Sequence, residues 1–420
     1  MIRTLLLARV GVLVAVVFVS SCATPGADAG IDRGGLQYLK QLQTLSRAQL
    51  DATWSKRPEL AARIGPAQCD VQAFEILYST IGVQGEPADA SATLLIPTGD
   101  GCTGPHPLLG WSNGTVTDRL QSLDEDLPLN LTLASVFAAH GYATVISSYL
   151  GLGKSSYPFH PYLHADSEAS AIVDSLRAAR RVASQTHIAL SGKVMLAGYS
   201  QGGHATLATQ RTIEGKHSRE FDLVASAPMS GPYALLQTFI SGWDGRVNGQ
   251  ANPLGPTLFA YTAVSYQHIY GDVWQAPIDV FKAPYDTKVE GLLPGPLDVY
   301  ALSRTGALPL DVDSLVQPSF HTDFITNTNN TFRQALARND LLDDWKPQTP
   351  TVLCGAGKDG VVDFENARTA NRVFVARGAT VRVIDVDALL PADVTGVAAH
   401  SNGMIACSVS VRDGLFEAAR

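Results

Sequence analysis

The stretch Lys193-Val-Met-Leu-Ala-Gly-Tyr-Ser-Gln-Gly-Gly203 begins as an apolar run, turns at Gly198-Tyr-Ser-Gln-Gly202 and continues into sequence compatible with a helix. This order predicts a buried strand that enters a helix through a sharp turn, with Ser200 at the turn. Gly198 and Gly202 permit the turn, because side chains there would collide with the neighbouring strand and helix. A serine held clear of the backbone beside a base can act as a nucleophile. Ser200 is therefore the candidate nucleophile.

The context of this five-residue motif decides its interpretation, because a chain with 37 glycines contains accidental matches. Residues 194–197 have the continuous apolar pattern of a buried parallel strand. The small residues Gly203, Ala205 and Ala208 suit a helix packed closely on a sheet. The turn also presents the backbone N–H of Gln201 at a helix N-terminus, where a developing oxyanion would be stabilised. This context favours a nucleophile elbow over an ordinary glycine-rich turn.

Strand-like and helix-like segments alternate around the elbow. Residues 36–64 favour an N-terminal helical arm, and 71–83 and 92–97 favour two antiparallel strands. Further strands are expected at 107–111, 142–147, 222–231, 349–355 and 380–384. Helices are expected at 131–141, from 166 to 183, and at 364–376. The alternation predicts an α/β fold with a mostly parallel central sheet and helices on both faces.

More than 110 residues, 231–344, interrupt this alternation and contain many aromatic residues among prolines and glycines. The segment leaves the sheet at the end of the strand after the elbow, on the side where Ser200 must be exposed. We expect an inserted, largely helical cap over the site, with most of its aromatic residues in the cap's own core. The main domain then comprises residues 36–230 and 345–420.

Carboxylates follow the first strand after the expected cap. A catalytic imidazole needs an anion behind it to fix its tautomer and stabilise its charged form, and a strand-end aspartate provides one. Asp359 lies nearer the strand end than Asp363, so Asp359 is the expected acid and Asp363 the alternative. His400, just ahead of a final helix, is the expected base, and a surface-loop histidine is the alternative interpretation. His204, four residues after Ser200, is expected to be a packed helix residue.

Asn113-Gly-Thr115 follows the strand expected at 107–111. A small glycine-containing loop at this place lets a second backbone N–H reach an oxyanion. Gly114 or Thr115 is therefore the expected second oxyanion donor beside Gln201, although Asn-Gly is also a common turn pair.

Ser148-Tyr-Leu-Gly-Leu-Gly-Lys-Ser155 is similar to a phosphate-binding loop, but such a loop must run into a helix. Pro158 and Pro161 follow at once and exclude that helix. The stretch is expected to line the rim of a pocket. His160 and Tyr162 lie nearby, either as substrate contacts or as packing residues.

The N-terminus has the pattern of an export signal. Two arginines precede the apolar run 10–19, which is too short for a bilayer span of about 20 residues. Val19-Ser20-Ser21-Cys22 resembles a bacterial lipobox, which implies a lipoprotein signal peptide at 1–21, lipidation of Cys22 and a tether at 22–35. The mature protein is then expected on a membrane surface of the cell envelope, the outer membrane if the host has one. Plain secretion is the alternative.

Charge limits the possible partners. The formal net charge is −8, and loss of residues 1–21 removes two arginines and no acidic residue, which makes it −10. An acidic chain binds polyanions poorly, so no nucleic-acid partner is expected. Arg177, Arg180 and Arg181 are expected on the solvated face of the helix that starts at 166.

Four cysteines remain besides Cys22. An even number in an exported protein favours disulfides, and four cysteines allow three pairings. Sequential pairing of Cys69 with Cys102 and of Cys354 with Cys407 is the simplest, and the second pair would enclose the candidate acid and base. Buried free thiols are the alternative. No C-x-x-C or H-E-x-x-H spacing is present, so no metal site is expected.

At these residues the chain resembles the secretory lipase family of α/β-hydrolases, the fungal lipase A type and its bacterial relatives. The resemblance covers about residues 70–410. It rests on Trp111-Ser-Asn-Gly-Thr115, Tyr149-Leu-Gly-Leu-Gly-Lys-Ser155, His160-Pro-Tyr162, Asp174-Ser-Leu-Arg-Ala178, Gly198-Tyr-Ser-Gln-Gly202, Gly357-Lys-Asp359 and His400. It implies an α/β-hydrolase fold with a cap, a Ser-Asp-His triad in that chain order and no cofactor. The chain departs from the family pattern at Ser148, where Asp is usual, and at Asn113, where His is usual.

The expected function is hydrolysis of carboxylic esters through an acyl-enzyme on Ser200, with His400 as general base and Asp359 as orienting acid. The substrate is expected to be a small-molecule or lipid ester. A serine aminopeptidase of the same fold is an alternative and would need an acidic anchor for the substrate amine. A non-catalytic envelope-binding lipoprotein is another, but the intact candidate triad favours an enzyme.

Overall fold

The computed structural model describes residues 30–119 and 127–420. The expected signal peptide 1–21, the lipidation site Cys22 and the tether up to residue 29 lie outside the described residues.

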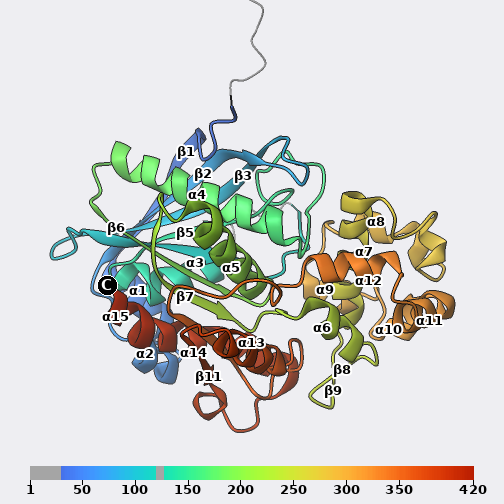
Figure 1. The fold of residues 1–420 in the computed structure, drawn as a ribbon. Coiled ribbons are helices and arrows are strands. Elements are labelled where there is room, and N and C mark those ends of the chain that lie inside the picture. Colours follow the sequence, from blue (N-terminus) through green and yellow to red (C-terminus); the bar gives the residue numbers. More distant parts are fainter. Residues whose placement is uncertain (1–29, 120–126) are drawn as a thin grey trace, which may run out of the picture. The chain divides into compact units, whose positions relative to one another are not determined.

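Nine strands form one mixed sheet (Figure 1). In spatial order they are β1 (Leu36–Leu45), β2 (Asp70–Ile81), β3 (Pro87–Thr98), β5 (Ala143–Ser147), β4 (His106–Ser112), β6 (Leu190–Tyr199), β7 (Asp222–Met229), β10 (Thr351–Gly355) and β11 (Val381–Asp385). The pairs from β1 to β5 are antiparallel, and the pairs from β5 to β11 are parallel. The predicted α/β-hydrolase fold with a mostly parallel sheet is confirmed.

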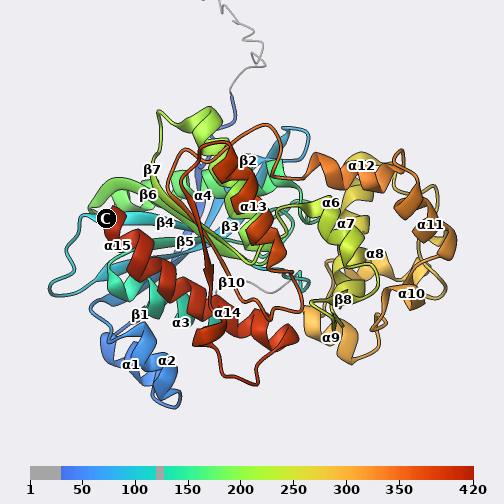
Figure 2. The ribbon, with the colours of Figure 1, turned by 60° about the horizontal axis from the view of Figure 1, so that its bottom comes forward.

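Helices cover both faces of the sheet (Figure 2). One face carries α4 (Ala165–Gln185), α5 (Gln201–Thr212) and α13 (Glu365–Ala376). The other carries α1 (Arg47–Trp54), α2 (Pro58–Ile64), α3 (Leu127–Val136), α14 (Gly396–Val411) and α15 (Glu417–Ala419). Alternate residues of β6 serve the two layers, because Met195 and Ala197 pack towards α14 while Val194 and Leu196 pack towards α4. Burial on both faces explains the unbroken apolar run before the elbow.

The residues between β7 and β10 form a group of short helices and one small hairpin, at the right of Figure 1. These elements are α6 (Leu235–Ser241), β8 (Arg246–Val247), β9 (Gln250–Ala251), α7 (Gly255–Tyr270), α8 (Val289–Leu292), α9 (Val299–Arg304), α10 (Val312–Leu315), α11 (Pro318–Thr326) and α12 (Thr331–Arg338). They share a hydrophobic core that includes Phe259, Tyr266, Phe281, Phe324 and Phe332. Most of the aromatic residues of the segment therefore pack in its own hydrophobic core.

The predicted helical arm at 36–64 is wrong in its first part. Residues 36–45 are the edge strand β1, and only 47–54 and 58–64 are helical. Leucines at every third position, Leu36, Leu39 and Leu42, imitate a helical stripe. At the sheet edge most side chains of β1 are exposed and only Leu45 is buried, so no alternating pattern of burial marks the strand.

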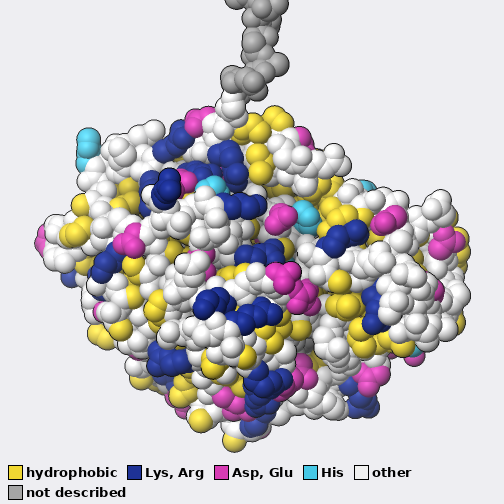
Figure 3. Space-filling view, in the orientation of Figure 1, with side chains coloured by type: hydrophobic (Ala, Val, Ile, Leu, Met, Phe, Trp, Pro, Cys, Tyr) yellow, Lys and Arg dark blue, Asp and Glu magenta, His cyan; other side chains and the backbone are white. Residues whose placement is uncertain are grey.

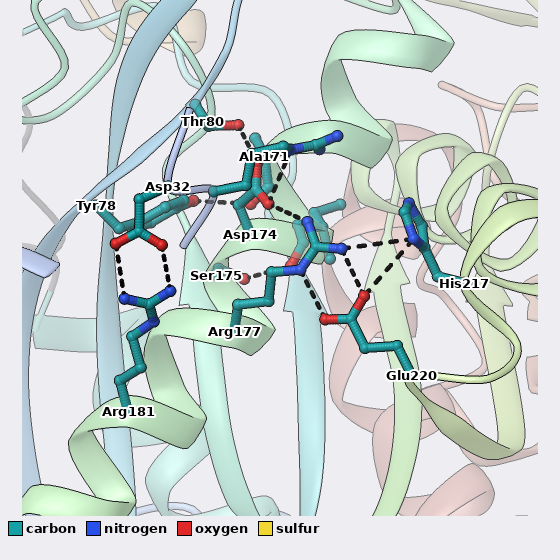
Figure 4. Close-up of polar contacts among 12 residues, drawn as sticks. Asp32, Tyr78, Thr80, Ala171, Asp174, Ser175, Arg177, Arg181, His217 and Glu220 are labelled. Carbon is teal, nitrogen blue, oxygen red and sulfur yellow. Dashed lines mark hydrogen bonds and ion pairs between the residues drawn. The ribbon is translucent and has the colours of Figure 1, made fainter. Parts of the chain in front are cut away.

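Ion pairs and hydrogen bonds on α4 contradict two expectations: that Arg177 lies on a solvated face, and that the chain up to residue 35 is a free tether (Figure 4). Asp174 is fully buried and accepts hydrogen bonds from Thr80 at 2.6 Å, from Arg33 at 3.0 Å and from Arg177 at 2.6 Å. Arg177 is therefore an internal partner of a buried carboxylate rather than a solvated residue, and its neighbouring carboxylates raise its pKa.

The same network extends to the end of the expected tether. Arg181 forms an ion pair with Asp32 at 2.5 Å, and the N–H of Gly34 donates to Ser79 at 2.8 Å. Arg180 lies over the Phe221 ring at 4.5 Å. Residues 32–35 are thus packed on the folded body. Asp32 and Arg33 form ion pairs with side chains of α4, and the backbone of Gly34 bonds to β2.

Charged side chains of both signs are interspersed with apolar ones on the face shown in Figure 3. No helix in the described parts of the chain combines the length and the apolar character that a bilayer span requires.

Candidate active site

Ser200 lies between the end of β6 and the first residue of α5. Its φ of 63° and ψ of −123° are a strained conformation for a residue with a side chain. A Cβ on Gly198 would lie 2.4 Å from the backbone oxygen of Gly202, and one on Gly202 would lie 2.0 Å from that of Ser112. Only glycine fits either position, so the turn keeps β4, β6 and α5 in close contact and projects the serine.

His400 and Asp359 are in direct contact. Nδ1 of His400 lies 2.6 Å from Oδ2 of Asp359, which is fully buried. The other oxygen of Asp359 accepts the N–H groups of Val361 and Val362 at 2.8 and 3.0 Å. These donors fix the carboxylate, and the imidazole is oriented by it. His400 is itself buried within α14, rather than on a loop ahead of the last helix.

Tyr199 connects the elbow to this pair. Its ring centroid lies 5.1 Å from that of His400, and its hydroxyl bonds to Ser230, whose own hydroxyl is 3.3 Å from Asp359. Burial, followed by the nearby Asp359 charge, raises the pKa of Tyr199. Ser200 is the next residue in the chain after Tyr199, so the elbow, His400 and Asp359 all border the group formed by Tyr199 and Ser230.

Asp363, the alternative acid, has another role in the structure. Its carboxylate accepts the N–H of Glu365 at 2.9 Å, and its backbone oxygen accepts from the Asn366 side chain at 3.3 Å. Asp363 thus stabilises the first turn of α13, where a negative charge is favourable.

His204, which the sequence placed as a packed helix residue, is fully buried. Its ring nitrogens face Oε2 of Glu168 at 2.7 Å and the backbone oxygen of Asn339 at 3.0 Å. Both ring nitrogens therefore already have partners, as expected for a packed helix residue. Glu168 also accepts from the Gln201 side chain at 2.9 Å, and that side chain bonds to Nε2 of His160 at 3.0 Å.

The three candidate oxyanion donors border the elbow. Gln201 is the first residue of α5, so its N–H has no acceptor within the helix. A Cβ on Gly114 would lie 3.5 Å from the backbone oxygen of Tyr199 and 4.0 Å from Cβ of Ser200. Thr115 follows, with its hydroxyl 2.8 Å from that of Tyr162.

His160 and Tyr162 are buried packing residues rather than an open rim. Nδ1 of His160 donates to the backbone oxygen of Leu150 at 2.9 Å, and burial lowers the pKa of His160 to about 4. The Tyr162 ring stacks on that of Tyr261 from α7, with centroids 4.4 Å apart and an angle of 4° between the planes. Tyr149 and Tyr261, to which the sequence assigned no individual role, complete this aromatic group.

A cavity of about 410 Å³ lies beside the loop that carries Asp359. Most of its lining comes from residues 238–259, and Val312, Val361 and Asp363 contribute the rest. Asn248, another lining residue, donates to the backbone oxygen of Asp359 at 2.6 Å. The segment between β7 and β10 therefore shapes the space next to the Asp359 loop.

The four cysteines form two disulfides, Cys69–Cys102 and Cys354–Cys407. The second joins β10 to α14 across 53 residues, and the loop that it closes contains Asp359 and His400. Within residues 30–119 and 127–420, no group of three or more His, Cys, Asp or Glu side chains is arranged to hold a metal ion.

Known proteins share this architecture. A family model described as "Secretory lipase" matches residues 125–254. The structure of the rice cell wall degrading esterase LipA from Xanthomonas oryzae is 44% identical, with a TM-score of 0.86 over 93% of this chain and 100% of its own. A putative hydrolase from Legionella pneumophila is 26% identical, with a TM-score of 0.78 over 90% of this chain and 97% of its own.

Candida antarctica lipase A, at 17% identity and a TM-score of 0.61 over 84% of this chain and 76% of its own, shares the fold. None of the curated protein sequences compared with the chain matches it.

Proposed function

Because the chain belongs to the secretory lipase family and is a carboxylic ester hydrolase, we propose that it forms an acyl-enzyme on Ser200, with His400 as general base and Asp359 as orienting acid. The observation that carries this proposal is the 2.6 Å contact between Asp359 and His400 beside the strained turn at Ser200. The acid makes Nδ1 the protonated nitrogen of the ring, which leaves the Nε2 lone pair for the serine proton.

In the first half-reaction Ser200 attacks the ester carbonyl while Nε2 of His400 takes the hydroxyl proton. The imidazolium then donates that proton to the departing alcohol. In the second half-reaction His400 takes a proton from water, which attacks the acyl-enzyme, and His400 then returns that proton to the departing Ser200 oxygen as the acid is released. Asp359 stabilises the imidazolium in both steps.

The tetrahedral intermediates carry a negative oxygen that needs donors. We assign the backbone N–H of Gln201 and that of Gly114 or Thr115 to this oxyanion hole. The position of Gln201 at the start of α5 supports the first assignment, and the approach of Gly114 to Ser200 supports the second.

Residues 231–344 are proposed as a cap that sets which esters enter. Support comes from the separate hydrophobic core of these residues and from their contact with the loop that carries Asp359, to whose backbone oxygen Asn248 donates. Each additional buried CH₂ of an acyl chain can contribute up to about 0.8 kcal/mol, so a cap pocket would discriminate chain length mainly in kcat/KM.

Family membership and two disulfides indicate an extracytoplasmic protein. We propose in addition that Cys22 is lipidated and holds the enzyme on a membrane surface. The lipobox-like sequence before Cys22 supports this location at the membrane surface.

The test combines covalent labelling with turnover. A fluorophosphonate probe should label the native enzyme at one serine, identified by peptide mass spectrometry, and Ser200→Ala should lose both the label and ester hydrolysis. Ser191→Ala, on the exposed start of β6, is the matched control and should keep both. A panel of p-nitrophenyl esters of graded chain length, run beside aminoacyl anilides, separates an esterase from an aminopeptidase. Wild-type activity in Ser200→Ala would overturn the proposal.

A further inference from the structure

Three buried tyrosine hydroxyls converge on the loop after β4. The Tyr149 hydroxyl donates to the backbone oxygen of Asn113 at 2.7 Å, and the Tyr261 hydroxyl donates to that of Val116 at 3.1 Å. Between them the Tyr162 hydroxyl and the Thr115 hydroxyl lie 2.8 Å apart. The loop at 113–116 is therefore held at three of its four residues.

The three tyrosines reach the loop from separate parts of the chain. Tyr149 follows β5 with a φ of 67°, a conformation that residues with side chains rarely adopt. Tyr162 comes from the segment before α4, and Tyr261 from α7. Their rings pack around His160, with centroid separations from its ring of 5.6, 6.0 and 5.6 Å. Burial raises the pKa of each hydroxyl, so each keeps its proton at neutral pH.

The contact from Tyr149 has a direct geometric consequence. A trans peptide is planar, and its N–H points opposite to its C=O. The oxygen of Asn113 is turned towards Tyr149, so the N–H of Gly114, in the same peptide, is turned away from Tyr149. Gly114 is the loop residue that borders Ser200.

We infer that Tyr149, Tyr162 and Tyr261 are positioning residues, whose hydroxyls hold the loop at 113–116 so that its N–H meets the oxyanion. The inference rests on the proposed function, which places an oxyanion donor at Gly114 or Thr115. None of the three hydroxyls touches substrate in this role, because each acts through the loop backbone or through Thr115.

Tyr261 makes the cap segment a part of this support. Further contacts tie the same two regions together: the N–H of Gly295 donates to Thr117 at 2.9 Å, and the Thr117 hydroxyl donates to Leu297 at 2.7 Å. The segment that shapes the cavity thus also braces the oxyanion loop. A change in how it is seated should therefore alter kcat as well as substrate preference.

Tyrosine-to-phenylalanine variants test the inference, because each removes one hydroxyl and keeps the ring. Loss of a whole oxyanion donor lowers kcat about 100- to 1,000-fold, and a loosened donor should cost less, about 10-fold in Tyr149→Phe and in Tyr261→Phe. KM for a p-nitrophenyl ester should stay within about twofold, because the oxyanion forms only after binding. Inhibition by a trifluoromethyl ketone, whose adduct carries the oxyanion, should weaken in parallel with kcat/KM.

Tyr266→Phe is the matched control. Tyr266 is buried on α7, the helix that also carries Tyr261. Its hydroxyl donates to the backbone oxygen of Leu163 at 3.0 Å rather than to the loop at 113–116. Its loss should lower the melting temperature about as much as loss of the Tyr261 hydroxyl but leave kcat near wild type. If a variant fails to fold, the hydrogen bond between the Tyr162 and Thr115 hydroxyls offers a second test. Tyr162→Phe and Thr115→Val each remove one of its two partners, and both should lower kcat.

Wild-type kcat and ketone inhibition in folded Tyr149→Phe and Tyr261→Phe would overturn the inference. Fluorophosphonate labelling separates this failure from failure of the proposed function. If only the inference fails, every tyrosine variant is still labelled at Ser200 and turns over normally. If the proposed function fails, the wild-type enzyme is not labelled at Ser200.

Discussion

Replacement of Asp359 by Asn gives the sharpest expectation for the site, because the hydrogen bonds around Asp359 decide how an amide would sit. Oδ1 accepts two backbone N–H groups, from Val361 and Val362. The amide oxygen must take that place, since an NH₂ group there would face two donors. The amide nitrogen then replaces Oδ2 and donates to Nδ1 of His400, which lies 2.6 Å away in the wild type.

This exchange reverses the tautomer of His400. A ring that accepts at Nδ1 carries its proton on Nε2, so it has no lone pair for the Ser200 hydroxyl. In the established Ser-His-Asp template such a change lowers kcat about 10⁴-fold, which corresponds to about 5 kcal/mol of transition-state stabilisation. Packing is unchanged, so the melting temperature should move little.

The assay is kcat for a short p-nitrophenyl ester between pH 6 and 9, with the melting temperature of each variant recorded. Asp363→Asn is the control: Asn can also accept the N–H of Glu365 at the start of α13, so kcat should stay within about twofold. A larger loss in Asp363→Asn than in Asp359→Asn, or a loss below tenfold in the latter, would refute the reasoning.

Three further outcomes are expected. Replacing both Cys354 and Cys407 by Ala should lower the free energy of unfolding by up to about 4 kcal/mol, from the 53-residue span of the crosslink, as measured by urea titration; no change in midpoint would contradict this. Burial lowers the pKa of three histidines to about 4: His140, His160 and His164. They stay neutral in the fold but gain protons on unfolding, so their contribution is complete above about pH 6.5 and is lost towards pH 4. The free energy of unfolding should fall by at most about 4 kcal/mol per pH unit as the pH is lowered through this range. Equal free energies of unfolding at pH 7 and 4.5 would exclude this dependence. Mass spectrometry of the mature protein should find acyl chains on Cys22, whereas an unmodified N-terminus in culture supernatant would rule them out.

The central part of the fold follows from local sequence. The strand and helix on either side of Ser200 were predictable because burial on both faces demands an unbroken apolar run, and because close packing demands Gly198 and Gly202. The fold class and the secretory lipase family were predicted from such segments and are confirmed.

The environment of His400 was harder to predict, because Ala399-His-Ser-Asn-Gly403 has the composition of a turn. In the structure these residues are helical, within α14. A Cβ on Gly403 would lie 2.5 Å from the Tyr199 hydroxyl, so this glycine serves close packing rather than a turn. Local composition cannot distinguish the two uses, since the partner is some 200 residues away in the chain.

The tyrosine contacts to the loop at 113–116 escaped prediction for the same reason. Tyr149 and Tyr261 act on residues 36 and 145 positions away, and nothing near either tyrosine indicates its partner. Strand β1 was missed because an exposed edge strand carries no periodic burial. Long-range polar contacts and sheet edges thus set the limit of inference from the chain alone.

The insertion between β7 and β10 separates in time the synthesis of two strands that are neighbours in the sheet. At roughly 5 to 20 residues per second, the ribosome needs about 6 to 24 s to add the ~120 residues that separate these strands. During that interval the edge of β7 that β10 will cover has no partner, which is a site for misassociation that chaperones commonly shield. His400 is translated later still, near the end of the chain. A nascent chain therefore carries Ser200, the proposed nucleophile, long before His400, the proposed base.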